Sequence, residues 1–211
     1  VDSTNGATAG GALYEGVTMQ LDGSFGSLMA GRYQAPSTAG FDAFGRFGDL
    51  YAAASSASGR LNKQIGYTTP NMNGFAASFH STIDPATNGA QSEEGQMRVS
   101  YAAGKFASAL TVRSLAAGGS NGKNLGLSYD LGAAKIMTIR DESTLGVKNN
   151  TFGVVVPMGA VAIQAQVRQG DSASQTAVGA TYALSKATSL VGAMMNETLG
   201  TSYRLGIKTA F

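Results

Sequence analysis

Apolar and polar residues alternate along much of this chain, as side chains do on the two faces of a β-strand. In the segment at 203–211, the residues Tyr203, Leu205, Ile207 and Phe211 share one parity. The same alternation recurs in earlier segments, at 97–101, 125–131, 152–158, 161–168 and 178–184. The pattern predicts an all-β fold in which each strand has one apolar face and one polar face.

The polar parity of these segments carries cations and amides as well as small residues. Its basic members are Arg98, Arg113, Arg168, Arg204 and Lys208. The core of a globular sheet does not accommodate cations in strand after strand, whereas the water-filled lumen of a membrane barrel does. We therefore expect the apolar faces to contact lipid and these cations to line a lumen.

The connections between the predicted strands alternate between short and long. Short turns fall at 22–23, 71–74, 103–105, 132–134, 157–160 and 185–188, and longer polar stretches at 36–58, 84–94, 117–123, 142–150, 169–175 and 196–201. Outer-membrane barrels have short periplasmic turns and longer outer loops, so this alternation predicts a transmembrane antiparallel β-barrel, a single domain over residues 1–211. We count about 13 strands, and because bacterial barrels have even numbers of strands, we expect further strands before Val1.

Composition narrows the chemistry that the chain can perform. The 211 residues include 29 glycines, no cysteine and one histidine, and the net charge is +2. These counts exclude disulfides and thiolate metal sites, and they give no reason to expect a nucleic-acid partner. No nucleophile, base and orienting acid can be assembled, and no apolar run is long enough for a membrane-spanning helix. We therefore predict a non-enzymatic protein without a cofactor or a metal.

The remaining titratable residues also have simple interpretations. His80 follows Phe79 near a strand end, and we expect a lumenal or boundary side chain there. The acidic pairs Glu93-Glu94 and Asp141-Glu142 are interpreted as solvated charges at loop edges.

Several stretches resemble the trimeric general porins of Gram-negative bacteria, most closely the beta-proteobacterial type. They are 23–32 (GSFGSLMAGR), 60–67 with 70–71 and 74–75, 182–186 (YALSK) with Thr188, and the terminal strand ending in Phe211. The resemblance implies a barrel of 16 strands, of which about 13 are represented here, with about three more before Val1. It also implies an outer-membrane, water-filled pore for passive diffusion of small hydrophilic solutes and ions.

Residues 36–58 form a connection too long and too mixed for a simple turn. The resemblance implies that this segment folds into the lumen and narrows it. The candidate constriction residues are Asp42, Arg46 and Asp49 on the segment and Arg32, Arg60 and Arg98 on the wall. An acidic loop opposite a basic wall produces a field that orients polar solutes and sets ion preference. Arg32 shares the outward parity of Leu28 and Ala30, but it lies at the strand end, where a bulge or the departure of the loop can redirect its side chain.

The resemblance also implies partners. These are a homotrimer, outer-membrane lipids and lipopolysaccharide, and the assembly machinery that recognises the terminal strand through Tyr203, Leu205, Ile207 and Phe211. Two other functions stay open on the sequence. One is a substrate-specific channel for anions such as phosphate or organic acids, and the other is a structural or adhesive barrel or a soluble all-β binding protein.

Overall fold

The computed structural model describes residues 16–34, 36, 46–47, 51–52, 60–83, 93–115, 121–143, 145–171, 174–197 and 200–209. Within these ranges the main element is a 13-stranded antiparallel sheet in which strands adjacent in sequence order are paired. The count of strands expected from the alternating pattern is thus confirmed. The described residues contain no helix with the length and apolarity needed to cross a membrane.

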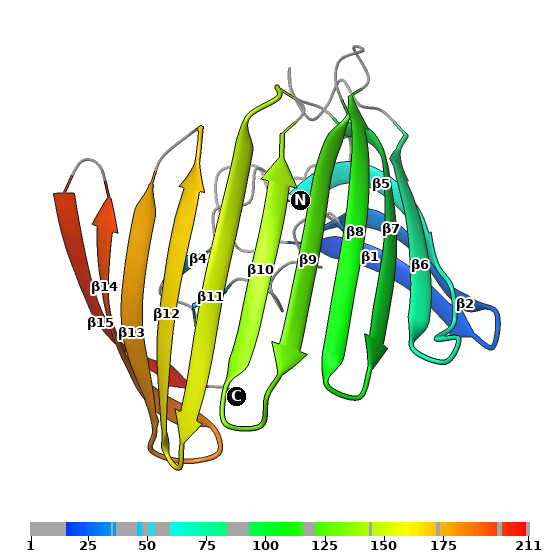
Figure 1. Ribbon diagram of the computed structural model, residues 1–211. Coiled ribbons are helices and arrows are strands. Elements are labelled where there is room, and N and C mark those ends of the chain that lie inside the picture. Colours follow the sequence, from blue (N-terminus) through cyan, green and yellow to red (C-terminus); the bar gives the residue numbers. More distant parts are fainter. Residues whose placement is uncertain are drawn as a thin grey trace.

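The sheet runs in chain order from β1 to β15. Its strands are β1 (Val17–Gly23), β2 (Gly26–Gln34), β5 (Arg60–Thr68), β6 (Phe75–Thr82), β7 (Glu93–Ala103), β8 (Phe106–Leu115), β9 (Gly122–Asp130), β10 (Lys135–Glu142), β11 (Lys148–Met158), β12 (Val161–Gly170), β13 (Gln175–Ala183), β14 (Thr188–Glu197) and β15 (Gly200–Thr209). Figure 1 shows that the sheet curves into a tall wall with β1 and β15 at its two edges. Two short strands, β3 (Arg46–Phe47) and β4 (Tyr51–Ala52), pair with each other outside this sheet.

The wall is inverted relative to a globular protein, with polar residues on its concave inner face and apolar residues on its outer face. Buried polar side chains include Gln64, Gln96, Thr111, Arg113, Asn124, Asp141, Asn149, Gln166 and Arg168. Large apolar side chains with substantial exposure include Met19, Phe79, Met97, Leu110, Phe152, Met158, Val178 and Leu205. Because lipid solvates the outer face of a membrane barrel and water fills its lumen, this distribution is the stable one.

The ends of the strands differ from the predicted boundaries. Tight turns at 104–105 and 159–160 place Gly104 and Gly159 at positive φ values of 54° and 64°, as two-residue hairpin turns require. At the opposite end, β10 extends to Glu142 and β11 begins at Lys148, within a stretch that the sequence suggested was loop. The ladders continue because unpaired backbone groups at a strand end gain hydrogen bonds by pairing.

A bulge interrupts the ladder between β2 and β5. Gly31 pairs with Gln64 and Tyr33 pairs with Leu61, so Arg32 faces two residues, Asn62 and Lys63. Lys63 takes up the extra length with a positive φ of 50°. Bulges of this kind bend the strand and redirect nearby side chains.

Candidate functional site

The inner face of the wall carries the cations that the alternating pattern predicted there. Arg98 lies between the exposed Met97 and Val99, so its own side chain is on the opposite, inner face. Arg113 and Arg168 are 1% and 6% exposed. Arg204 and Lys208 have the parity opposite to the exposed Tyr203, Leu205 and Ile207 on β15. The inner wall therefore carries cations on β7, β8, β12 and β15.

Arg113 is held in a polar network on the inner face of β8, β9 and β10. Its Nη2 lies 3.9 Å from Oδ1 of Asp141 and donates a hydrogen bond of 3.3 Å to the carbonyl oxygen of Glu142. Asn124 Nδ2 donates to the same Asp141 oxygen. The guanidinium lies over Gly122, where an added Cβ would come within 2.9 Å of both Nε and Nη2. The network fixes a cation against the wall with a carboxylate beside it.

The position of Asp141 differs from the one expected from the sequence. The sequence predicts that the pair Asp141-Glu142 is solvated charge at a loop edge, but Asp141 is 2% exposed. That interpretation is wrong for Asp141 because β10 extends through this pair, and the alternation then turns Asp141 inward and Glu142 outward. The alternating pattern gave no signal for this placement, because Asp141 shares its parity with the apolar residues Met137 and Ile139, which are also buried on the inner face.

A second charged group continues the polar network across β12, β13 and β14. Arg168, Gln175 and Glu197 are successive cross-strand neighbours. Gln175 Nε2 donates to Oε1 of Glu197, and Arg168 interacts electrostatically with both Glu197 and Asp141. Cations and carboxylates thus alternate around the inner wall near the ends of the strands that bear the longer connections.

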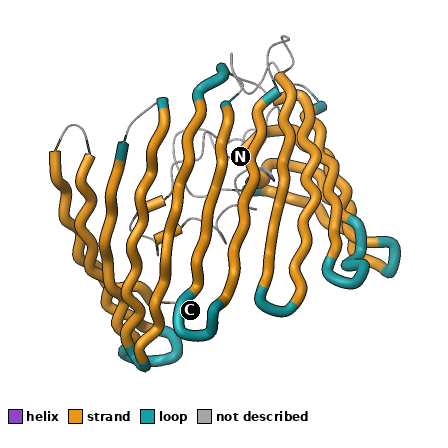
Figure 2. Tube along the Cα trace, viewed as in Figure 1, coloured by secondary structure: helices purple, strands orange, loops and turns teal. Residues whose placement is uncertain are grey.

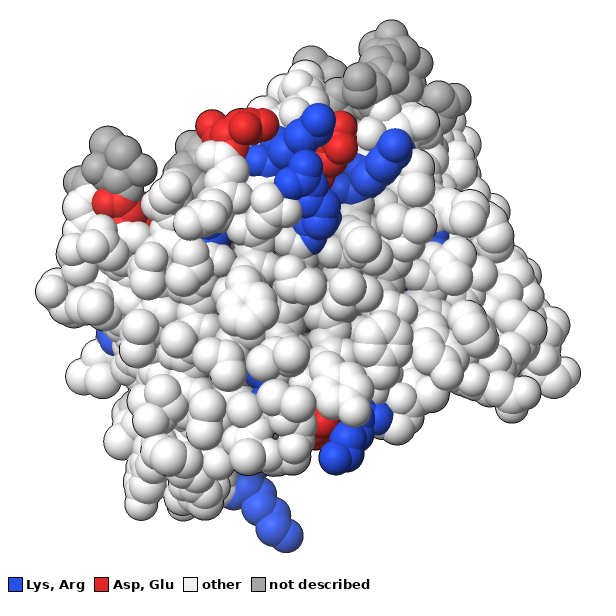
Figure 3. All heavy atoms as spheres, in the orientation of Figure 1, with Lys and Arg blue, Asp and Glu red and all other residues white. Residues whose placement is uncertain are grey.

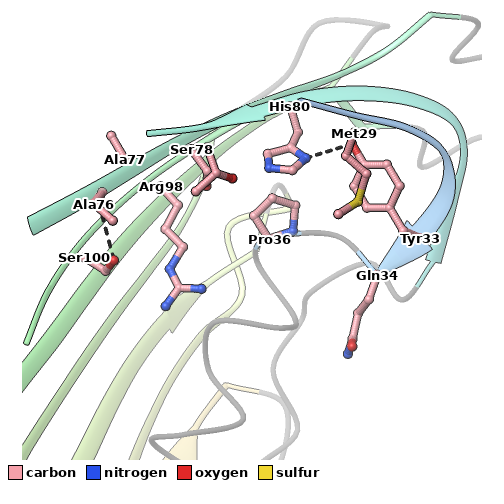
Figure 4. Close-up of a pocket in the computed structure, with 11 residues that line it drawn as sticks. Met29, Tyr33, Gln34, Pro36, Ala76, Ala77, Ser78, His80, Arg98 and Ser100 are labelled. Atoms are coloured by element: carbon pink, nitrogen blue, oxygen red, sulfur yellow. Dashed lines mark hydrogen bonds between the residues drawn. The ribbon is translucent and has the colours of Figure 1, made fainter. Parts of the chain in front are cut away.

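A recess of 360 Å³ opens in the inner wall where β2, β5, β6 and β7 meet. Tyr33 and His80 form one side of it, with the Tyr33 hydroxyl 2.9 Å from Nδ1 of His80, and Arg98 lines it from β7 (Figure 4). His80 is therefore lumenal in position. The recess lies beside Pro36, two residues beyond the end of β2. Sequence reasoning missed the pairing of Tyr33 with His80, which are 47 positions apart.

The remaining candidate constriction residues have varied placements. Arg32 pairs with Val17 on the parity of the exposed residues Met19 and Leu21, and its Nη1 donates a hydrogen bond of 2.5 Å to Oδ1 of Asn62. Arg60 is exposed at the start of β5. Their part in a constriction stays a prediction.

The long connection is described only at short points. Asp42 and Asp49 lie outside the described residues, and Arg46 lies in β3. The backbone of β3 contacts β12, although seven strands of the sheet lie between β2 and β12. Figures 1 and 2 show the β3–β4 pair behind the outer wall, on its concave side. A part of this connection therefore lies across the interior from the strand that precedes it.

The outer face carries its charges at the two margins. Figure 3 shows a broad uncharged surface with basic and acidic residues gathered together near its upper and lower edges. At the end with the longer connections, Lys123, Arg140 and Lys148 share the outer face of three adjacent strands. On β15, Tyr203, Leu205 and Ile207 are 75%, 89% and 72% exposed, and Phe211 lies outside the described residues.

Comparison with known families identifies the family of this chain. A family model described as Gram-negative porin matches residues 1–201. The chain belongs to the Gram-negative porin family. Among solved structures, this porin is similar to an anion-selective porin from Comamonas acidovorans, with 25% identity and a TM-score of 0.70 over 93% of this chain and 78% of that chain.

A second solved structure shares the fold alone. It is a triple mutant of the Rhodopseudomonas blastica porin, with 15% identity and a TM-score of 0.74 over 96% of this chain and 80% of that one. No curated protein sequence matches the porin. The family and the fold place the protein in the bacterial outer membrane, as a water-filled pore for passive diffusion of small hydrophilic solutes.

Proposed function

We propose that this porin is a general diffusion pore with a mild preference for anions. The observation that carries the proposal is the row of inner-face cations, Arg98, Arg113, Arg168, Arg204 and Lys208. Asp141 and Glu197 on the same face offset part of this charge. A lumen with excess positive charge concentrates anions and lowers their barrier to entry. The similar Comamonas porin is itself described as anion-selective.

We further propose that residues 36–58 form the constriction. The contact between β3 and β12 supports a path for this segment across the lumen. In this arrangement Asp42, Arg46 and Asp49 lie opposite wall cations, with Arg98 as the best-placed wall residue and Arg32 and Arg60 at the root of the loop. The resulting field across the narrow section favours polar solutes over apolar ones.

Bilayer recording tests the proposed selectivity. With a tenfold KCl gradient across a planar bilayer, the reversal potential should indicate greater permeability to chloride than to potassium. Replacing both Arg204 and Lys208 with Gln should reduce that preference, and the effect should be larger at low salt, where screening is weak. A cation-selective reversal potential in the unaltered protein would contradict the proposal.

Disulfide trapping tests the position of the loop, because the chain contains no cysteine. A variant with Phe47→Cys on β3 and Gln164→Cys on the inner face of β12 should form an internal disulfide in membranes. The matched control places the second cysteine at Ile163, which is 40% exposed on the outer face of the same strand. Equal trapping of both pairs, or of neither, would oppose a loop that lies inside the lumen.

The outer face supports proposals for the partners. The basic cluster Lys123, Arg140 and Lys148, in which Glu142 lies in register between the two lysines, suits the phosphate groups of lipopolysaccharide, since it keeps an excess of positive charge and borders the apolar surface at the end with the longer connections. The exposed residues Tyr203, Leu205 and Ile207 suit recognition by the outer-membrane assembly machinery, together with Phe211. Deleting Phe211 should lower the amount of assembled protein without altering single-channel conductance.

We also propose that the porin forms a homotrimer. In gel electrophoresis without heating, a homotrimer should appear as a heat-sensitive band at three times the chain mass.

A further inference from the structure

We propose that the recess at β2, β5, β6 and β7 is a binding site for a small carboxylate with a flat apolar body, such as benzoate. The inference rests on the proposed anion-preferring pore and adds a class of solute to it. The recess has three features that act together: apolar walls, an aromatic side formed by Tyr33 and His80, and a guanidinium from Arg98. Each of these recognises a different part of such a solute.

The size and lining of the recess favour an organic solute over an inorganic ion. Its volume is 360 Å³, within the range of pockets that bind small organic molecules. Met29, Pro36 and Ala76 supply apolar surface to its lining. A bare chloride or phosphate gains nothing from these walls, whereas the ring of an aromatic acid loses unfavourable contact with water there.

Arg98 supplies the charge that a carboxylate needs. Its neighbours in register on the inner face are Ser78 on β6 and Thr111 on β8. Arg98 lines the recess from β7, and Figure 4 shows it on one side of Pro36 with Tyr33 on the other. The planar fork of a guanidinium matches a carboxylate through two parallel hydrogen bonds. The ligand's charge would therefore lie toward β7 and its ring toward β2 and β6.

The aromatic side of the recess is held in a fixed shape. The hydrogen bond between Tyr33 and His80 joins β2 to β6, and the two rings meet edge to face with centroids 5.5 Å apart. Gly66 on the intervening β5 leaves the space that this pair occupies. A prearranged aromatic surface binds a flat ring without an ordering cost and prefers offset or edge contacts with it.

The test compares benzoate with acetate on the intact porin. In bilayers, benzoate should reduce the chloride current in a saturable manner at concentrations where acetate does not. In detergent, saturation-transfer NMR should show transfer from the protein to the benzoate ring. The variant Arg98→Gln should weaken the apparent benzoate affinity about tenfold or more, because a charge-assisted bond is lost. Ala76→Phe, which fills the recess, should abolish the saturable block and the ring transfer.

The control and the possible outcomes separate this site from the pore itself. Arg204→Gln removes an inner-face cation on β15, away from the recess, and it should shift the reversal potential while leaving the benzoate affinity within about twofold. A conducting porin with no saturable benzoate effect and no ring transfer would overturn the site and leave the pore intact. Equal loss of benzoate affinity in Arg98→Gln and Arg204→Gln would show general charge attraction, and would also overturn it. A protein that never conducts would overturn the proposed function instead.

Discussion

The hydroxyl of Tyr33 on β2 and Nδ1 of His80 on β6 lie 2.9 Å apart, and their hydrogen bond crosses Gly66 on the strand between them. The two outer strands are thereby connected on the inner face, over a residue without a side chain. A Cβ at position 66 would overlap the His80 ring and come within 2.7 Å of the Tyr33 oxygen.

Gly66→Ala should therefore separate Tyr33 from His80 and destabilise the barrel by about 1–3 kcal/mol, the usual cost of overpacking. Urea unfolding in lipid vesicles provides the measurement. The matched control is Gly206→Ala, because an added Cβ at that strand position meets no atom within 4 Å. Gly206→Ala should leave the unfolding midpoint nearly unchanged, and an equal shift in both variants would contradict the steric explanation.

Asp141→Asn should make the pore more anion-selective and less stable. The substitution removes a carboxylate that lies 3.9 Å from the buried Arg113 guanidinium on the inner wall. We expect a larger chloride preference in reversal-potential measurements and a loss of about 1–3 kcal/mol in unfolding free energy. Glu142→Gln is the control, since this neighbouring acid has the outward parity. A shift in reversal potential from Glu142→Gln as large as that from Asp141→Asn would contradict the assignment of faces.

Two adjacent valines test the orientation of the wall. Val154 has the parity of the exposed Phe152 and Met158, whereas Val155 pairs with Gln164 on the inner face. Val154→Arg places a cation in lipid near the middle of β11 and should reduce folding stability by about 2–4 kcal/mol. Val155→Arg places the same cation in water, so it should fold and increase chloride preference. The readout is the fraction folded into vesicles, and similar losses for both variants would oppose the proposed orientation.

The basic cluster on the outer face should stabilise the porin only when lipopolysaccharide is present. A triple variant with Lys123, Arg140 and Lys148 each changed to Gln should lose most of the rise in melting temperature that added lipopolysaccharide produces. Each basic residue near an anionic surface contributes about 1 kcal/mol. The control changes Lys105, Lys135 and Lys186 to Gln at the short-turn end, and it should keep the full rise. Equal effects of both triple variants would indicate net charge alone.

Uninterrupted alternation was enough to place the wall cations from sequence. Arg113 and Arg168 are both inner-face residues because no bulge disturbs the parity of their strands. The inference failed for Asp141, where a charged pair suggested a loop although the ladder continued through it. At Arg32 the period-2 pattern did not predict the surroundings of the side chain. The extra residue in β5 that lies opposite Arg32 becomes evident only from the pairing of β5 with β2.

The alternation of polar and apolar residues could not predict the recess. Tyr33 and His80 meet only through two successive registers, from β2 to β5 and from β5 to β6, and the bulge changes the first of them. The alternation of polarity predicts which face a residue occupies but not how far one strand slides along the next. The contact between β3 and β12 is likewise set by the path of a long connection rather than by any local pattern.

Because the wall is inverted, the strand residues fall into two classes, those that contact lipid and those that contact water. Residues such as Phe152 and Leu205 meet lipid and must stay apolar for the protein to remain in the membrane. Their immediate neighbours along the strand face the lumen, where a change of charge does not place that charge in lipid. Selectivity and membrane residence can therefore evolve almost independently, one substitution apart along the same strand.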